Sequence, residues 1–412
     1  MSKFEVVPEL RFSGFNKAWS KKRLKEIGTF LGGGTPSKTN PDFWTGLIPW
    51  VSSSDITDDS IHQIKVTRFI TEDAIAKSAT KLVPENTILL VSRVGVGKLA
   101  VTTKNLCTSQ DFTNFSPSEG DVYFLAYYLK SKSTEFLKFN QGMAIQGFTK
   151  DDISNFAIYI PQDLEEQQKV ADCLSSIDDL ITTNIKKLES LKLHKKGLMQ
   201  KLFPEEEKNV PELRFSDFEG DWKPASIAKM GMVVTGSTPS TSHREYYGGE
   251  HLFVSPADIS ENRFIETTKS TLTTEGIRKS RVVQSGSVLF VCIGSTIGKT
   301  AQVKYDCATN QQINAITAFQ GYDDDFLYYL LSFHSLTISE LAGKQAVPII
   351  NKATFSKVVL MVPEEKEQKR IADILSSIDE LIHAQADKIE TLKEYKKGLM
   401  QKLFPEIKEY IA

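Results

Sequence analysis

The chain has few cysteines and no long apolar run. Only Cys107, Cys173, Cys292 and Cys307 occur in 412 residues, and no two of them form a CxxC pair. We therefore expect neither a disulfide framework nor a structural zinc site, and we expect a reducing compartment. The opening residues, MSKFEVVPELRF, lack the apolar core of a signal peptide, and the longest apolar run, residues 288–293, is too short to span a membrane. A soluble, cytoplasmic protein is expected.

The chain also lacks an excess of charge of either sign. Its 50 basic and 52 acidic residues give a formal net charge of −2, which excludes a uniformly basic coat for nucleic acid. Hydrophobic residues make up 40% and charged residues 25%, so the chain can bury real cores. Its length suits two to four units of about 100–200 residues.

Familiar catalytic motifs are missing as well. Residues 294–300 resemble a phosphate loop but hold three residues between the glycines where four are needed, and residues 95–99 lack the Ser or Thr for magnesium. A hairpin turn with an exposed lysine fits these segments better. The six histidines lack metal-ligand spacing, and neither GxSxG, GxGxxG after a strand nor an Asn/Asp-Pro-Pro-aromatic run occurs. No metal site is expected, and an enzyme with its own active site is disfavoured.

What the chain does contain is a tandem repeat. Residues 7–13 (VPELRFS) recur at 210–216, Trp19 recurs as Trp222, and residues 166–205 recur at 367–406 with 26 of 40 positions identical. The offset is 200–203 throughout, so the two halves share a fold. In mid-chain, the sequence KGLMQKLFPE is followed closely by VPELRF. The second copy of KGLMQKLFPE lies near the end of the sequence and the first copy of VPELRF near its start, so the order of the repeated segments is circular. We expect the two ends to lie close together in a closed, pseudo-twofold object.

The closely repeated segments are predicted to be long helices, at 161–204 and 363–405, because apolar residues alternate at spacings of four and three. Residues 163–179 hold six acidic residues and one basic residue, and residues 180–203 hold one acidic and six basic. This charge distribution favours antiparallel pairing, in which the acidic half of one helix meets the basic half of the other. The predicted coiled-coil seam consists of Val170, Leu174, Ile177, Ile181, Asn184, Leu188, Leu191, Leu198, Leu202, Ile371, Leu375, Ile378, Ile382, Gln385, Ile389, Leu392, Leu399 and Leu403.

Two polar positions interrupt this seam. If the helices cross at Asn184, it faces Gln385, and the pair sets the register at some cost in stability. The alternative is that both residues are exposed at the edge of the seam. In this register Lys195 lies near Asp373, and Lys396 near Asp172.

The diverged segments, residues 1–160 and 205–362, are predicted to be α+β globules, and residues 406–412 a tail. Short β-like runs occur at 87–92, 98–102, 287–293 and 300–303, and one aromatic, helix-like run occurs in each globule, at 122–139 and 326–341. The architecture is therefore two tandem globules joined by an antiparallel intramolecular coiled coil, with no alternating βαβ sheet.

The loops of both globules are rich in side chains that can contact DNA. Asn and Gln pair with adenine, Lys and Arg with guanine or phosphate, and Ser and Thr are adaptable donors. The candidates are Ser37, Lys38, Ser52, Ser53, Arg93, Lys98, Gln146 and Lys150 in the first globule and Ser240, Arg244, Ser255, Lys299, Asn310, Gln311, Gln312, Lys344 and Lys352 in the second. Each of them is also an ordinary surface or turn residue when taken alone.

The chain resembles the specificity subunit of a type I restriction–modification system. The resemblance spans nearly the whole chain and rests on PELRF with Trp19 and Trp222, on GGTPS and GSTPS, on VSSSDI and VSPADI, and on the helix text EQ(Q/K)(K/R)(V/I)ADxLSSID…KKGLMQKLF. It implies a non-catalytic subunit with two target recognition domains, each reading one half of a split sequence in double-stranded DNA. The helices would act as a ruler for the spacer and would dock two methyltransferase subunits.

The resemblance also implies that nuclease/translocase subunits can join the complex. S-adenosylmethionine, ATP and magnesium would then be bound by the partner subunits and not by this chain. Because the two globules differ, an asymmetric bipartite target is expected. The alternative interpretation is a protein scaffold, with two adaptor domains on a coiled-coil rod and no DNA binding. An autonomous methyltransferase or nuclease would require the isolated chain to bind a cofactor.

Overall fold

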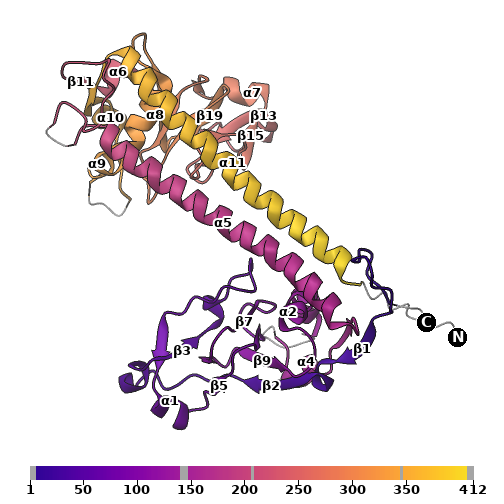
Figure 1. Cartoon of the computed structure of the whole chain (residues 1–412). Coiled ribbons are helices and arrows are strands. Elements are labelled where there is room, and N and C mark those ends of the chain that lie inside the picture. Colours follow the sequence, from indigo (N-terminus) through magenta and orange to yellow (C-terminus); the bar gives the residue numbers. More distant parts are fainter. Residues whose placement is uncertain (1–5, 140–146, 206–207, 344–346, 406–412) are drawn as a thin grey trace. The chain divides into compact units, whose positions relative to one another are not determined.

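The computed structural model describes residues 6–139, 147–205, 208–343 and 347–405 (Figure 1). The chain divides into two compact units: unit 1 comprises residues 1–185 and 387–412, and unit 2 comprises residues 186–386. Both boundaries fall inside the two long helices, α5 (Leu164–Leu202) and α11 (Glu365–Leu403). Each helix therefore contributes one half to each unit.

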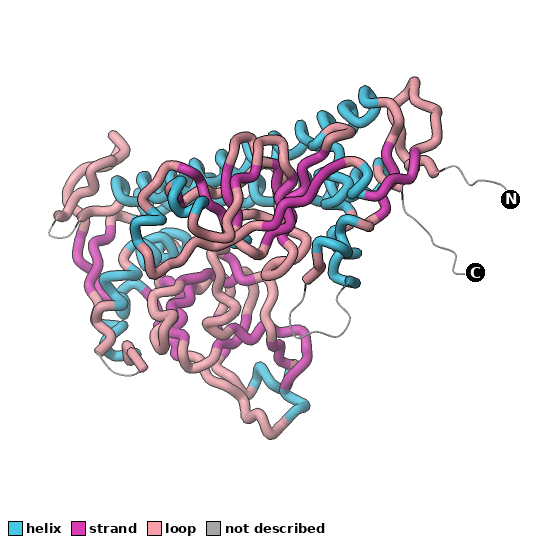
Figure 2. Tube along the Cα trace, turned by 90° about the horizontal axis from the view of Figure 1, so that it is seen from below, coloured by secondary structure: helices cyan, strands magenta, loops and turns pink. Residues whose placement is uncertain are grey.

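Unit 1 contains two four-stranded sheets and a two-stranded ribbon. Figure 2 shows the strands of the chain in magenta and the helices in cyan. One sheet is antiparallel, in the order β2-β9-β6-β7; the other, β4-β3-β8-β5, contains the parallel pair β3 and β8; the ribbon pairs β1 with β10. Its strands are β1 (Ser20–Arg23), β2 (Gly28–Gly32), β3 (Ile48–Val51), β4 (Arg68–Ile70), β5 (Leu82–Val83), β6 (Ile88–Val91), β7 (Leu99–Val101), β8 (Leu106–Thr108), β9 (Phe112–Pro117) and β10 (Ala157–Ile160).

Unit 2 repeats this plan, except that its first sheet has a fifth strand, β14. Its sheets run β12-β20-β17-β18-β14 and β15-β13-β19-β16, and β11 pairs with β21. Its strands are β11 (Lys223–Ser226), β12 (Gly231–Thr235), β13 (Tyr247–Val254), β14 (Phe264–Ile265), β15 (Ser270–Leu272), β16 (Val282–Val283), β17 (Val288–Val291), β18 (Thr300–Val303), β19 (Cys307–Thr309), β20 (Ile313–Ala318) and β21 (Val359–Val362). The α+β prediction is confirmed, and the four predicted β-like runs contain β6, β7, β17 and β18.

The remaining helices are short. Each predicted aromatic run is broken in two, at Lys132 and His334, so neither forms one continuous helix. In unit 1 they are η1 (Leu24–Glu26), η2 (Pro41–Trp44), η3 (Ser53–Asp55), α1 (Glu72–Ala76), α2 (Val122–Ser131), α3 (Ser133–Phe136), η4 (Leu137–Phe139) and α4 (Lys150–Ser154). In unit 2 they are α6 (Ile227–Met230), η5 (Arg244–Tyr246), α7 (Thr274–Arg278), α8 (Asp324–Phe333), α9 (Ser335–Ser339) and α10 (Lys352–Lys357).

The main core of unit 1 joins the globule to the long helices. The aromatic helix α2 is almost wholly buried, and its residues form one cluster with Val170 and Leu174 of α5 and with Met400 and Leu403 of α11. In unit 2, α8 forms the equivalent cluster with Leu202 of α5 and with residues 371–375 of α11. Burial of each large apolar side chain contributes about 1.5–3 kcal/mol, so the helix halves are structural parts of both globules.

The helix halves run antiparallel within each unit, as predicted. In unit 1, Lys396 contacts Asp178, while Leu403, further along α11, shares a cluster with Val170, which lies earlier in α5. The same reversal holds in unit 2. The predicted seam residues are buried or half-buried throughout, and Asn184 and Gln385 are 8% and 6% exposed, so neither is at an exposed edge. Their role in setting the register stays a prediction.

The expected lysine pairings are wrong by six residues. Lys195 bonds to Asp379, not Asp373, and Lys396 bonds to Asp178, not Asp172. The physical reason is side-chain direction: in a helix the Cα–Cβ bond leans toward the N-terminus. In an antiparallel pair, a lysine on one helix and an aspartate further along the other therefore lean toward each other.

The two described ends of unit 1 lie together, as the circular repeat predicted. The Leu10 N–H donates to the Lys402 carbonyl at 2.9 Å, and the Leu213 N–H donates to the Lys201 carbonyl at 2.8 Å in unit 2. Within the described ranges, no helix is both long and apolar enough to cross a membrane.

Candidate nucleic-acid interface

The repeated PELRF motif has a structural role in each unit. Arg11 donates two hydrogen bonds to the carboxylate of Glu166 on α5, both of 2.8 Å, and the Trp19 indole donates a third at 3.1 Å. In unit 2 the same arrangement joins Arg214 and Trp222 to Glu367 on α11. Glu166 and Glu367 are almost fully buried. These motifs therefore anchor the segment before each globule to the start of a long helix.

A second cluster, buried in unit 1 and partly exposed in unit 2, ties the helix pair to each globule. In unit 1, the Tyr127 hydroxyl donates to Asp178 at 2.6 Å, and the Lys396 ammonium donates to the other oxygen of that carboxylate. In unit 2, Tyr329, Asp379 and Lys195 repeat the cluster. Burial, followed by the neighbouring aspartate, raises the pKa of both tyrosines well above the ordinary value of 10, so both stay protonated donors. These residues are structural and lie outside the candidate interface.

The polar loops of unit 1 meet at one edge of its sheets, which we call loop edge 1. It consists of residues 33–40, 52–55, 92–97 and 109–111, which follow β2, β3, β6 and β8. Backbone hydrogen bonds hold these loops together: Gly34 donates to Thr108, Ser109 to Val51, and Ser92 to Asp111, at 2.7–2.9 Å. Side chains at such an edge are supported by a rigid framework.

Loop edge 2 is its counterpart in unit 2, with residues 236–241, 255–258, 292–298 and 310–312. Ser237 donates to the Thr309 carbonyl at 2.9 Å, Asn310 to Val254 at 3.0 Å, and Cys292 to Gln312 at 2.8 Å. Residues 294–298 form the turn between antiparallel β17 and β18, so the predicted hairpin is confirmed.

A glycine makes the closest approach at each edge. A Cβ on Gly33 would lie 2.0 Å from the Ser109 carbonyl oxygen, and a Cβ on Gly236 would lie 2.2 Å from that of Asn310. No side chain fits at these distances, so the Gly-Gly-Thr-Pro-Ser and Gly-Ser-Thr-Pro-Ser segments require glycine at their first position, where they pack against the next loop.

The structure places only some of the unit 1 candidates at the open surface of loop edge 1. Ser37, Lys38 and Arg93 are exposed. Ser52 is held within the edge, because its hydroxyl donates to Asp55 and accepts from Arg68. The other candidates are distributed as follows: Ser53 is buried in the same turn, Lys98 is half-buried at the end of the 92–97 turn, Lys150 is exposed at the start of α4, and Gln146 lies outside the described residues.

In unit 2, too, only some of the candidate DNA-binding residues are exposed. Ser240, Arg244 and Gln311 are exposed, and Arg244 lies beside the edge in η5. Asn310 and Gln312 are half-buried and bond to each other, the Asn310 amide donating to the Gln312 side-chain oxygen at 2.9 Å. The remaining candidates are placed as follows: Ser255 donates to Asp258, Lys299 donates to the Ile259 carbonyl, Lys352 is exposed at the start of α10, and Lys344 lies outside the described residues.

Sequence reasoning missed Gln110 in loop edge 1. It is exposed and accepts a hydrogen bond from Thr35, as Gln311 accepts one from Thr238 at 2.7 Å. The signal was present in the repeat, because Ser109-Gln110-Asp111 lies 201 residues before Asn310-Gln311-Gln312.

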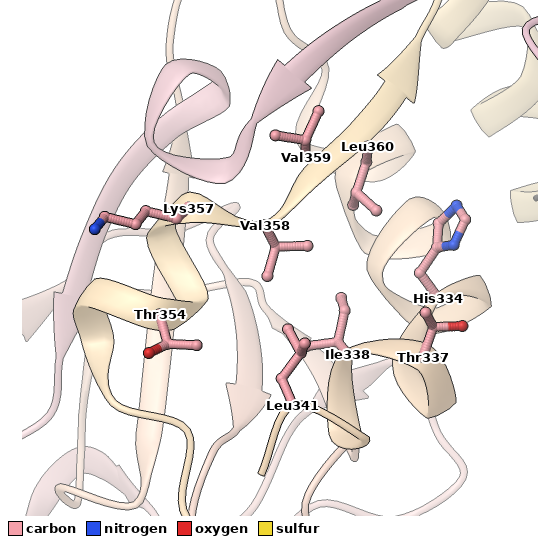
Figure 3. A pocket seen from close by; sticks show the side chains of 9 residues that line it. All are labelled: His334, Thr337, Ile338, Leu341, Thr354, Lys357, Val358, Val359 and Leu360. Carbon is pink, nitrogen blue, oxygen red and sulfur yellow. The ribbon is translucent and has the colours of Figure 1, made fainter. Parts of the chain in front are cut away.

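A hollow of about 450 Å³ lies elsewhere in unit 2, between α9, α10 and β21 (Figure 3). Ile338, Leu341 and Val358 line it, with His334 at one side. The corresponding residues of unit 1, 202 positions earlier, are Phe136, Phe139 and Phe156, whose rings pack together with centroids 5.2–6.5 Å apart. The hollow thus reflects smaller side chains at positions that are aromatic in unit 1. Among the described residues, no three His, Cys, Asp or Glu side chains are grouped to hold a metal.

Comparison with known proteins agrees with this architecture. Residues 16–193 and 219–394 match the family described as type I restriction modification DNA specificity domain. The MjaIX specificity subunit of a type I restriction enzyme from Methanocaldococcus jannaschii is 26% identical over 403 residues, covering 94% of this chain and 93% of the relative. The two family matches correspond to the two halves of the tandem repeat.

Solved structures share the fold. The S subunit of a type I restriction–modification system from M. genitalium superposes with a TM-score of 0.62 at 16% identity, covering 97% of this chain and all of that chain. A chain from a structure on the complex assembly and conformational transition of the type I system gives a TM-score of 0.60 at 17% identity, covering 94% and 97%. With two family matches over most of its length, the chain belongs to the type I restriction–modification DNA specificity family and is a DNA sequence-recognition subunit of such a system.

Proposed function

We propose that each unit reads one half of an asymmetric, bipartite DNA target, and that loop edges 1 and 2 carry the reading side chains. The observation that carries the proposal is that one loop framework occurs twice with different side chains on it. Arg93 of loop edge 1, for example, occupies a turn whose counterpart in loop edge 2 carries Ile293. Amide and guanidinium groups on such loops can pair with base edges, and lysines with phosphates.

The paired helices set the spacer between the half-sites in this proposal and dock two methyltransferase subunits. Their length supports it, since each of α5 and α11 has 39 residues and takes part in the cores of both units. The chain itself contributes recognition and no catalysis. S-adenosylmethionine, ATP and magnesium are bound by the methyltransferase and the nuclease/translocase subunits that join the complex.

Mapping of methylated positions tests the proposal. The full chain is expressed with its methyltransferase subunits in a host without other methylation, and modified bases are located throughout the genome. We expect one split sequence with two unlike halves. Transfer of residues 109–111 and 33–40 from another specificity subunit should change one half and leave the other unchanged.

The helices are tested separately. An insertion of four residues after Leu188, within α5, should change the spacer and leave the bases of both halves unchanged. Altered bases with an unchanged spacer would contradict the ruler role of the helices. A stable complex that neither binds nor methylates DNA would support the scaffold interpretation, and methylation without sequence choice would contradict the whole proposal.

A further inference from the structure

The loop between β8 and β9 and its counterpart between β19 and β20 are built alike. Each loop has three residues, 109–111 or 310–312, and the side chains of the first and third are joined by a hydrogen bond. The Ser109 hydroxyl donates to Asp111 at 3.1 Å, and the Asn310 amide donates to Gln312 at 2.9 Å. The first and third residues differ between the two loops and are half-buried or buried. The residue between them is a glutamine in both loops, Gln110 or Gln311, and in both it is exposed.

Each of these glutamines is held by a threonine from a different loop. Thr35 donates its hydroxyl proton to the side-chain oxygen of Gln110, and Thr238 does the same to Gln311 at 2.7 Å. The threonine loops are themselves fixed, since Gly34 and Ser237 donate to the Thr108 and Thr309 carbonyls. Each amide is therefore oriented before any ligand arrives, which lowers the entropy that binding must remove.

The hydrogen bond from threonine leaves a defined set of groups on the amide. A glutamine side chain has two lone pairs on oxygen and two N–H donors. Threonine occupies one lone pair, so one acceptor and the donors remain. A side-by-side acceptor and donor match the N6 amino group and N7 of adenine in the major groove. Guanine presents two acceptors there, O6 and N7, and would place its O6 against the amide oxygen.

We propose that Gln110 and Gln311 each read an adenine, at equivalent positions of the two half-sites. The inference rests on the proposed function, because it assumes that the loop edges face DNA. It adds that the two different half-sites both contain an adenine at this position, because both loop edges present a glutamine amide that a threonine holds in place. Ser109, Asp111, Asn310 and Gln312 position the glutamines and do not contact bases.

The test uses the full complex with methyltransferase subunits and a library of DNA sites in which every position of the target is varied. Gln110→Ala should lower the preference for adenine over the other bases at one position of one half-site by roughly 5- to 150-fold, as expected for loss of one bidentate contact. Gln311→Ala should do so at the equivalent position of the other half-site. Gln110→Glu, which lacks a donor, should favour cytosine, whose N4 amino group donates.

A matched control lies in the same unit. Gln63 is exposed, and its amide donates to the Thr182 hydroxyl on α5 at 3.1 Å, so its side chain contacts the long helix. Gln63→Ala should leave the base preference unchanged. Thermal unfolding of all variants reports whether the loops remain folded.

The outcomes are distinct. An equal loss of binding to every site, with base preferences intact, would overturn the inference and assign Gln110 and Gln311 a structural role. A changed preference at a position that holds no adenine would also overturn it. If the unaltered complex shows no sequence preference, the proposed function fails and the inference falls with it; a sequence preference that survives both glutamine substitutions defeats the inference alone.

Discussion

The Lys396 ammonium lies 2.5 Å from Oδ1 of Asp178, and both side chains are almost completely buried within unit 1. The equivalent pair of unit 2, Lys195 and Asp379, has a similar distance of 2.6 Å but is about one-fifth exposed. Two copies of one contact thus differ in their access to water. Because burial decides the cost of an unpaired charge, the two pairs are expected to respond differently to the same substitution.

Lys396→Met should lower the free energy of unfolding by about 3–5 kcal/mol, since it leaves the Asp178 carboxylate buried without its cation. Lys195→Met should cost less, because water reaches Asp379. Chemical denaturation of the purified chain measures both. Lys393→Met removes two partly exposed ion pairs, one with Glu390 on the same helix and one with Asp59, and should change stability by less than about 1 kcal/mol. Equal losses for Lys396 and Lys195 would contradict the role of burial.

Glu166→Gln should loosen the segment before the first globule. The substitution removes the charge that accepts both hydrogen bonds from Arg11 and the one from Trp19, at a cost of about 3 kcal/mol. Residues 6–19 should then be cleaved faster by protease and should exchange amide hydrogens faster. Glu165→Gln breaks only an exposed pair with Lys169 and serves as the control. Unchanged cleavage in the Glu166 variant would show that other contacts hold the segment.

Filling the hollow of unit 2 should stabilise that unit. The double substitution Leu341→Phe and Val358→Phe supplies the rings that occur at the corresponding positions of unit 1, and cavity filling typically adds about 0.5–2 kcal/mol. The melting temperature should rise. The reverse change, Phe156→Val in unit 1, should lower it. A fall in both variants would mean that the hollow is too small or too rigid for the rings.

Acid should destabilise unit 2 partly through His334. Burial lowers the pKa of this imidazole from 6.5 to about 4 in the folded chain, so the unfolded chain binds the proton more readily between these values. Stability from this group is therefore complete above pH 6.5 and is lost as the pH falls toward 4. His334→Gln should make the unfolding free energy less dependent on pH in this window. An unchanged pH profile would contradict the effect.

The long helices could be predicted from the sequence because their information is local. Alternating spacings of apolar residues and flanking prolines gave 161–204 and 363–405, against the observed Leu164–Leu202 and Glu365–Leu403. The sheets could not be assembled this way. Strand β1 pairs with β10, as Ser20 does with Ile160, and β3 lies parallel to β8. When short strands pair with strands far along the chain, the periodicity of the sequence does not indicate their order in the sheet.

Only part of the candidate interface could be predicted from the sequence, because the contacts that orient its side chains come from residues far along the chain. Exposed Arg93 and Gln311 stood out by residue type, but nothing local separates Gln311 from Gln312, which is turned inward toward Asn310 and the Ile293 carbonyl. The orientation of the Gln110 side chain depends on a hydrogen bond from Thr35, which lies 75 residues earlier in the sequence. Only a comparison of the two repeats residue by residue would have connected them.

The hydrogen bond from Leu10 to Lys402 has a further consequence when set beside that from Leu213 to Lys201. The second bond closes a short, continuous stretch of chain, whereas the first joins residues that lie far apart in the sequence. The same junction is thus covalently continuous in unit 2 and is made by a hydrogen bond between distant segments in unit 1. Each repeat lends half of a helix to the core of the other, so a single repeat made alone would lack part of its own interior, whereas two separate copies could complete one another.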